Sequence, residues 1–210
     1  MLHRMTHDSA TDDVPDEQLL SRIAVGDGEA LTALFRRRQG DVYRVAMLMT
    51  GSAAAAEDVT QDVFLSVIRD ASRFEPGRAS VAAWLCGIAR NHARRRLDRE
   101  WRTVPLPEHS ELTRAVPAVQ PDPVGDLSSA EQLERLRRAV LSLPIRYREV
   151  VVLCDLQELS YTDAAVALDC GVGTVRSRLH RARALLAAKL RATVNGCAPA
   201  SAKKITRCLA

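Results

Sequence analysis

The 210-residue sequence has few aromatic residues and no long apolar run, and both shortages narrow the classes of protein that it can encode. Only 4% of the residues are aromatic, whereas 47% are hydrophobic, with alanine and leucine dominant, and this composition favours helices over β-sheets. No stretch reaches the roughly 18 uninterrupted apolar residues of a membrane span, and residues 1–13 lack the apolar run of a signal peptide. We therefore expect an all-α, cytoplasmic protein without membrane insertion.

The sequence also lacks any recognisable cysteine framework. Its cysteines are odd in number and form no CxxC pair: Cys86, Cys154, Cys170, Cys197 and Cys208. Neither a disulfide network nor a zinc site is indicated, and we predict no metal and no cofactor. Cys197 and Cys208 lie in a tail (194–210) that matches no motif, so a redox pair and a frayed end both stay open, with the frayed end as the default.

The chain is long enough for two small domains, since domains usually hold roughly 100 to 150 residues. Apolar residues recur at helical spacing through 16–100 and again through 129–193. Between them, residues 101–128 contain five prolines and few periodic apolar residues, which is typical of an extended, flexible linker. The sequence therefore predicts two small helical domains joined by a linker.

The second domain contains a predicted helix-turn-helix, in which a glycine-bearing turn (169–172) separates a short helix from a long final helix (173–191). The second helix of this motif enters the DNA major groove. Val175, Leu179 and Ala182 share one face of that helix and are expected to point inward. A solvated basic face is the alternative. The predicted DNA-contacting residues are Thr174, Arg176, Ser177, Arg178, His180 and Arg181.

The first domain ends in a basic helix that follows a proline-glycine loop (74–78). Arginines in the last turns of a helix also complement its dipole, so this cluster is less specific by itself. Aromatic side chains beside positive charge, however, are what holds melted single strands of nucleic acid. The residues predicted for this role are Arg73, Phe74, Trp84, Arg90, Asn91, Arg94 and Arg95.

A third helix, predicted over 53–69, is apolar on one side and acidic on the other. Glu57, Asp58, Gln61 and Asp62 form the polar stripe, while Phe64 belongs to the apolar side. A solvated face and a metal site are the alternatives to a binding surface. Metal is disfavoured because no histidine or further carboxylate lies at a suitable spacing.

The order of these segments resembles the extracytoplasmic-function (ECF) branch of the bacterial sigma-70 family. The resemblance covers roughly residues 16–191 and rests on several short sequence motifs in the right order rather than on a single motif. The matching motifs are EQLL at 17–20 with GD at 26–27, AEDVTQDVF at 56–64, WLCGIARN at 84–91, LP at 143–144, YREV at 147–150 and GTVRSRLHRAR at 173–183.

The resemblance implies a function and a set of partners. The stripe residues with Phe64 would bind core RNA polymerase at the clamp of its largest subunit, and the flap of the second-largest subunit is the second expected contact. The loop 73–78 and the helix through Arg95 would capture and open the minus-ten promoter element, and the final helix would read the minus-thirty-five element. The linker would run near the RNA exit path. An anti-sigma factor is the expected restraint, and the chain itself would perform no bond chemistry.

Two positions depart from the family pattern, and two rival functions remain. Gly171 stands where the family commonly has proline, and Asp169 replaces a frequent glycine, so entry into the final helix is expected to be looser. A free-standing helix-turn-helix regulator would not need the first domain as it stands here. An enzyme acting on DNA is disfavoured, because the sequence has neither a GxxxxGK[ST] phosphate loop nor a convincing metal cluster.

Overall fold

The computed structural model describes residues 14–103 and 129–194, and within these ranges the chain is helical with no strand. The all-α prediction is therefore confirmed. Most of the predicted linker (101–128) and of the tail, including Cys197 and Cys208, lies outside the described residues. No helix in the described part of the chain is long and apolar enough to cross a membrane.

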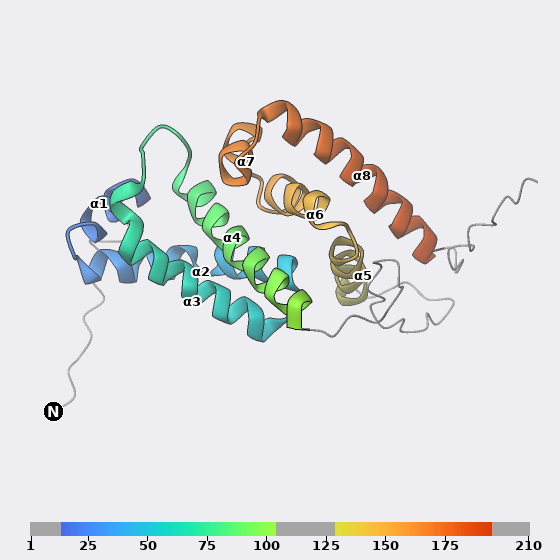
Figure 1. The fold of residues 1–210 in the computed structure, drawn as a ribbon, viewed down its shortest axis with the longest axis horizontal. Coiled ribbons are helices and arrows are strands. Elements are labelled where there is room, and N and C mark those ends of the chain that lie inside the picture. Colours follow the sequence, from blue (N-terminus) through green and yellow to red (C-terminus); the bar gives the residue numbers. More distant parts are fainter. Residues whose placement is uncertain (1–13, 104–128, 195–210) are drawn as a thin grey trace, which may run out of the picture.

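The N-terminal domain is a set of four α-helices in which α2 packs against α1, α3 and α4 (Figure 1). Capping residues set the ends of these helices and therefore their lengths. The elements are α1 (Asp16–Ile23), α2 (Gly28–Thr50), α3 (Ala53–Asp70), the 3-10 turn η1 (Ala71–Arg73) and α4 (Val81–Thr103). Helix α4 continues three residues beyond the predicted domain end at 100.

Local residues explain the breaks between these helices. The carboxylate of Asp27 accepts hydrogen bonds from the backbone N–H groups of Glu29 and Ala30 at 2.9 and 3.1 Å, so it caps the start of α2. Gly51 ends the same helix in the left-handed conformation, with φ of 78°, which glycine adopts without steric cost. Ser52 then caps α3. Aspartate, glycine and serine are the residues that typically cap helices at such positions.

The C-terminal domain consists of shorter helices followed by one long helix. Its elements are α5 (Ser129–Leu141), α6 (Ile145–Val151), the π-helical turn η2 (Val152–Leu156), α7 (Tyr161–Leu168) and α8 (Val172–Val194). Apolar residues at helical spacing would by themselves predict one continuous helix over 145–156. The structure widens its last five residues into a π-helical turn, a form that is rare and that sequence periodicity does not reveal.

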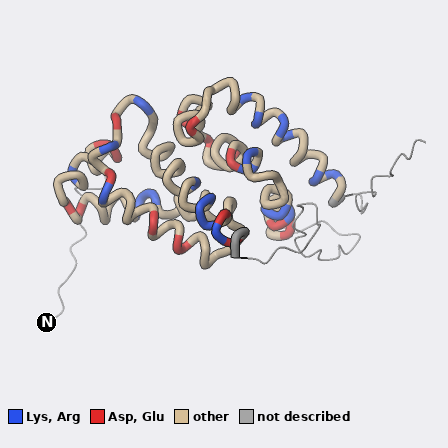
Figure 2. The backbone as a smooth tube through the Cα atoms, viewed as in Figure 1, with Lys and Arg blue, Asp and Glu red and all other residues tan. Residues whose placement is uncertain are grey.

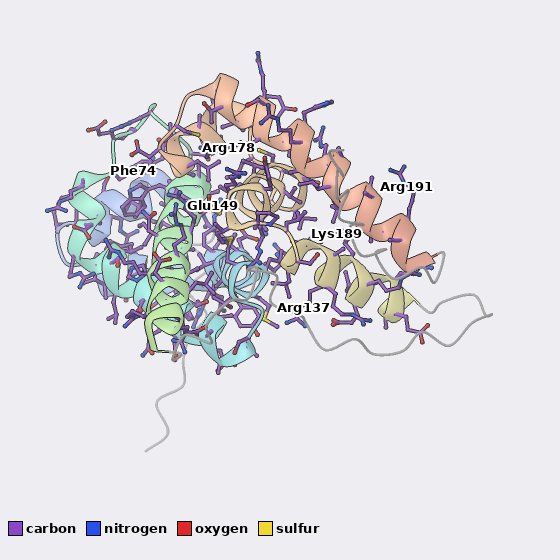
Figure 3. The ribbon with its side chains drawn as sticks, turned by 45° about the vertical axis from the view of Figure 1, so that its right-hand side comes forward. Phe74, Arg137, Glu149, Arg178, Lys189 and Arg191 are labelled. Carbon is purple, nitrogen blue, oxygen red and sulfur yellow. The ribbon has the colours of Figure 1, made fainter. Side chains whose placement is uncertain are left out.

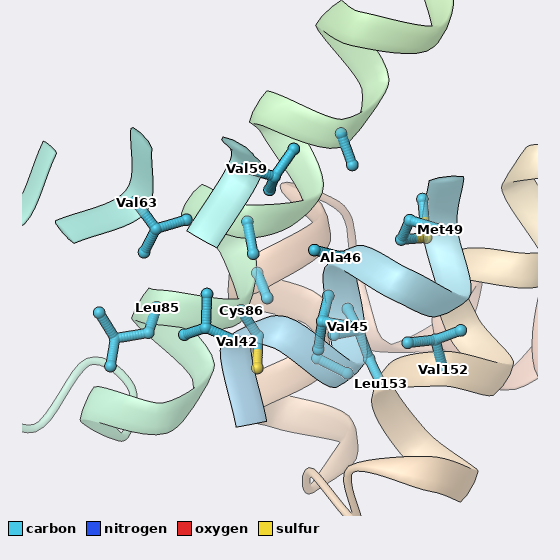
Figure 4. Packing of buried hydrophobic residues seen from close by; sticks show 14 of the residues in the cluster. Val42, Val45, Ala46, Met49, Val59, Val63, Leu85, Cys86, Val152 and Leu153 are labelled. Atoms are coloured by element: carbon cyan, nitrogen blue, oxygen red, sulfur yellow. The ribbon is translucent and has the colours of Figure 1, made fainter. Parts of the chain in front are cut away.

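The two domains share one hydrophobic core. Figure 4 shows Val45 and Met49 of α2 beside Val152 and Leu153 of the C-terminal domain, and all of these side chains are at most 1% exposed. Helix α4 lies between α3 on one side and α7 on the other (Figure 1). The sequence predicted two domains, and the structure adds that they are packed together along α4.

Candidate DNA-binding and polymerase-binding surfaces

The helix-turn-helix is formed by α7, a three-residue turn and α8. The hydroxyl of Ser160 accepts a hydrogen bond from the N–H of Asp163 at 3.0 Å and caps α7. Asp169 closes that helix in the left-handed conformation, with φ of 51°. The carbonyl of Gly171 then accepts from Thr174 and Val175 at 2.9 and 3.1 Å, which starts α8. The turn is therefore built although Gly171 and Asp169 depart from the family pattern.

Helix α8 buries one side and leaves its basic side exposed. Val175, Leu179 and Ala182 are at most 1% exposed, so the opposite face of the helix points to solvent. Blue segments mark its basic residues along much of its length (Figure 2). Of the residues predicted to contact DNA, four are exposed and two are half-buried: Arg176, Ser177, His180 and Arg181, and then Thr174 and Arg178.

Two contacts fix arginines on this helix. The guanidinium of Arg176 lies 5.8 Å from the ring centre of Tyr161, the first residue of α7, in cation–π geometry. Arg183 donates to Asp155 and is engaged within the chain. Figure 3 labels Arg178, Lys189 and Arg191, which lie at successive positions along α8. The basic side of α8 thus contains both exposed and internally paired cations.

The predicted minus-ten residues begin at the loop before α4. Phe74 and Trp84 pack edge to face with ring centres 5.7 Å apart, and both are half-buried. Arg73 pairs with Asp70 at 3.0 Å, yet its side chain is 80% exposed. Asn91 is exposed on α4, and its side-chain oxygen accepts from Arg90 at 3.0 Å. The aromatic pair Phe74–Trp84 thus lies near polar residues of α4.

The arginines of α4 divide into two groups. Arg94 and Arg95 are exposed and Arg90 is half-buried, and Arg90 and Arg94 both reach Glu149 of the other domain. The Nε of Arg90 donates to Oε1 of Glu149 at 2.8 Å, and Nη1 of Arg94 lies 3.6 Å from the same oxygen. Glu149, labelled in Figure 3, is only 2% exposed. It was not predicted from the sequence, although a lone acid beside the apolar run 150–154 was a usable signal.

The acidic stripe of α3 is also divided between two neighbours. Glu57 and Gln61 are exposed and line a groove beside α2. Asp58 and Asp62 face α4 instead: Asp58 accepts from Arg96 at 2.6 Å, and Asp62 lies 3.6 Å from Nδ1 of His92. The stripe is therefore not one uniform acidic surface.

The groove between α2 and α3 has a volume of about 800 Å³ and an apolar floor. Phe64, predicted as a polymerase contact, is 6% exposed and packs edge to face on Phe35 with ring centres 4.8 Å apart. Its role in this structure is to form the floor, because its side chain points inward on the apolar side of α3. Leu65 and Ile68, which the sequence analysis passed over, are 50% and 51% exposed and line the same groove.

No cluster of three or more His, Cys, Asp or Glu side chains suited to a metal ion occurs among the described residues. Cys86 and Cys154 lie apart from the surfaces above, and burial raises the pKa of these thiols to about 12 and about 11. Thiols with such pKa values are poor nucleophiles at neutral pH. Neither Cys86 nor Cys154 is therefore suited to act as a nucleophile.

Comparisons with known proteins match both domains. Residues 34–103 match the family model for Sigma-70 region 2, and residues 133–186 match that for Sigma-70, region 4. The ECF RNA polymerase sigma factor SigM of Mycobacterium tuberculosis is 36% identical over 173 residues, which cover 82% of this chain and 83% of that protein. This chain belongs to the ECF branch of the sigma-70 family.

Other relatives of this sigma factor agree with that assignment. The ECF RNA polymerase sigma-E factor of Escherichia coli is 32% identical over 182 residues, covering 82% of this chain and 93% of that protein. SigE of Mycolicibacterium smegmatis is 36% identical over 167 residues, but the match covers only 62% of its length and 76% of this chain. As a sigma factor, the chain serves transcription initiation by RNA polymerase.

Solved structures support the fold of this sigma factor. CnrH, solved in complex with the cytosolic domain of CnrY, has a TM-score of 0.62 and 27% identity, covering 84% of this chain and 97% of CnrH. RpoE of Bartonella quintana, solved with the anti-sigma factor NepR, has a TM-score of 0.59 and 26% identity, covering 75% of this chain and 94% of RpoE. Both are helical proteins captured with a bound partner.

Proposed function

We propose that this sigma factor binds core RNA polymerase through the groove between α2 and α3, reads duplex DNA with α8, and holds melted DNA with the 74–80 loop and α4. The polymerase performs the chemistry. The observation that carries the proposal is that one chain presents an apolar groove with a polar and charged rim and, separately, a basic helix-turn-helix.

The polymerase contact is supported by the character of the groove. Phe35, Leu65 and Ile68 are 38% to 51% exposed, which is unusual for large apolar side chains and typical of a protein-binding surface. Glu57 and Gln61 line the groove on its α3 side and suit basic groups of a partner, whereas Arg36 and Arg37 line it on its α2 side. The clamp of the largest polymerase subunit is the proposed partner here, and the flap of the second-largest subunit is proposed for the C-terminal domain.

The promoter contacts are proposed for two elements. On α8, Arg176 and Arg181 are exposed and suited to guanine or phosphate contacts at the minus-thirty-five element. At the minus-ten element, Phe74 and Trp84 offer stacking surfaces, and Arg95 supplies positive charge. Control by an anti-sigma factor fits the complexes in which CnrH and RpoE were solved. Because RNA polymerase is its partner, we propose that the protein acts in the cytoplasm.

The experiment that tests this function is a pull-down of bacterial core RNA polymerase by the full chain, followed by run-off transcription from a genomic library. Transcripts that start behind a shared two-part motif support the proposal. Tight DNA binding without polymerase association would instead favour a free-standing regulator.

Charge-changing variants separate the two surfaces. Replacing Glu57 and Gln61 with lysine should weaken polymerase binding and leave binding to duplex promoter DNA unchanged. Arg176→Ala should weaken promoter binding by about 1 to 3 kcal/mol if a base contact is lost, with polymerase binding intact. Glu17→Lys on the exposed surface of α1 is the matched charge control. Loss of polymerase binding in all of these variants alike would contradict the proposed division.

A further inference from the structure

Glu149 is a buried carboxylate whose partners come from the other domain. It lies on α6 with 2% of its side chain exposed, and its Oε1 meets Arg90 at 2.8 Å and Arg94 at 3.6 Å, both on α4. Arg90 is itself only 11% exposed. A buried charge is tolerated only when it is paired, so this contact holds only while the two domains are together.

Two further contacts place α7 against the start of α4. The carboxylate of Asp163 accepts from the backbone N–H of Ser80 at 2.9 Å. A Cβ built on Gly87 would lie 3.3 Å from Cα of Ala167 and 3.6 Å from its Cβ, so the two helices touch at this point. The helix proposed to hold melted DNA is thus covered on one side by the helix-turn-helix domain (Figure 1).

This closed arrangement does not fit simultaneous contact with both promoter elements. Sites about 25 base pairs apart are separated by roughly 85 Å at about 3.4 Å per pair. A compact body of about 150 residues has a radius of gyration near 15 Å and is therefore only about 40 Å across. If the proposed function is right, the domains must separate before α4 and α8 reach their two elements.

We propose that Glu149 competes with nucleic-acid phosphate for Arg90 and Arg94, so that the closed arrangement is a self-inhibited form of this sigma factor. The inference rests on the proposed DNA-binding role of α4. The carboxylate occupies the guanidinium group of Arg90 as a phosphate would, and it does so only when α6 lies against α4. Arg94 is held less tightly, at 3.6 Å with 44% of its side chain exposed. Opening therefore frees Arg90 for DNA, removes the attraction of Glu149 on Arg94, and exposes Glu149 to water at the same time.

The first test is Glu149→Gln in the full chain, which removes the charge and keeps the shape. Solution X-ray scattering should show a larger radius of gyration than for the wild type. Binding of a short single-stranded oligonucleotide, followed by fluorescence anisotropy, should become tighter, and its logarithmic salt dependence steeper by about 0.7 for the one cation, Arg90, that the closed form covers. An unchanged radius with unchanged oligonucleotide binding would overturn the proposal.

Asp16→Asn is the matched control for this variant. Asp16 is 8% exposed and also lies between two arginines, with Nη1 of Arg37 and Nη2 of Arg38 each 2.5 Å from its oxygens, but all three residues belong to the N-terminal domain. This change removes an equally buried carboxylate without touching the domain interface. The radius of gyration should stay at the wild-type value, and expansion equal to that of Glu149→Gln would overturn the proposal.

The second test fixes the closed form and does not depend on the folding of the first variant. Gly87→Cys with Ala167→Cys places two Cβ atoms within the range of a disulfide, in a background whose five native cysteines are replaced by alanine or serine. The oxidised protein should bind the oligonucleotide about tenfold more weakly than the same protein after reduction, because Arg90 stays paired with Glu149 and α7 stays against α4. Equal binding in both redox states would overturn the proposal.

The two proposals fail in different ways. If the reduced and wild-type proteins do not bind core polymerase, the proposed function fails, whatever the oligonucleotide measurements show. If polymerase binding and promoter-specific transcription are intact but oxidation changes neither, the proposed function stands and the self-inhibition is wrong.

Discussion

Arg183 of α8 donates hydrogen bonds to both carboxylate oxygens of Asp155 in η2, at 3.0 Å from Nε and 2.5 Å from Nη2. This bidentate pair raises the pKa of the guanidinium above its already high ordinary value. The pair connects α8 to the π-helical turn η2 at the end of α6. Arg183 is therefore paired within the protein and is not among the arginines of α8 that can contact DNA.

Asp155→Asn should release Arg183 for DNA. The pair is partly exposed, so the free energy of unfolding should fall by no more than about 1 kcal/mol. The logarithmic salt dependence of duplex binding should steepen by about 0.9, because one more phosphate contact becomes available. Titration of a labelled duplex at several salt concentrations measures both the affinity and the slope. Arg176→Ala, which removes an exposed cation, should flatten the slope by a similar amount, and a slope that Asp155→Asn leaves unchanged would contradict the assignment.

Arg148→Met should destabilise the fold strongly. The guanidinium of Arg148 donates to the carbonyl of Met49 at 2.6 Å and also to the carbonyls of Leu141 and Leu143, at the ends of α2 and α5. Its loss leaves these carbonyls without their charged donor and should cost about 3 kcal/mol in urea unfolding. The control is Arg146→Met, because Arg146 is exposed on the same helix and should shift stability by no more than about 0.5 kcal/mol.

Asp169→Gly should stabilise the helix-turn-helix. Asp169 has a φ of 51°, a left-handed conformation that costs an L-residue about 1 kcal/mol and glycine nothing. The urea midpoint should therefore rise by the equivalent of roughly 1 kcal/mol or slightly less. Gly51→Ala is the opposite case, since Gly51 has a φ of 78° and a Cβ there would lie 3.3 Å from the Leu141 side chain. That variant should lower the midpoint, and a loss of stability in Asp169→Gly would contradict the argument.

His92 should make stability fall in mild acid. Burial between α3 and α4 lowers the pKa of His92 below its usual 6.5, an effect that Asp62 opposes and that Arg95, Arg69 and Arg99 reinforce. The folded state therefore binds fewer protons than the unfolded state, and stability present above pH 6.5 is lost as the pH falls through the lowered pKa. The slope should stay well under the limit of about 1.4 kcal/mol per pH unit for one proton, because His92 is only half-buried.

Urea unfolding at pH 7.5 and pH 5.5 measures this effect. The loss of stability between the two values should be smaller in His92→Gln, which keeps a polar group near Ser66, 3.0 Å from Nε2 of the histidine. The same loss of stability in both proteins would show that another group is responsible.

Much of the fold follows from neighbouring residues and was predictable for that reason. Capping by Ser160 and the left-handed Gly51 depend on contacts within a few positions, so they fix helix ends wherever the helices finally pack. The burial of Val175 and Leu179 follows from helical periodicity alone. The outward basic face of α8 was determined in the same way.

The site was predictable only where exposure follows from periodicity. Phe64 was assigned to a binding surface because it belongs to the motif at 56–64. The tertiary structure buries it against Phe35, because both residues belong to apolar faces that meet. Asp58 and Asp62 lie on the polar side as predicted, but their partners are on α4, far away in sequence.

The sequence by itself determined the helical class, the helix-turn-helix and the family, because each depends on local order or on motifs. Only the tertiary structure decided that the domains close on each other and that Arg90 and Arg94 meet Glu149, 59 positions beyond Arg90. Periodicity reports which face of a helix is apolar. It does not report which other helix will cover that face, because that choice depends on packing and charge pairing summed over the whole interface.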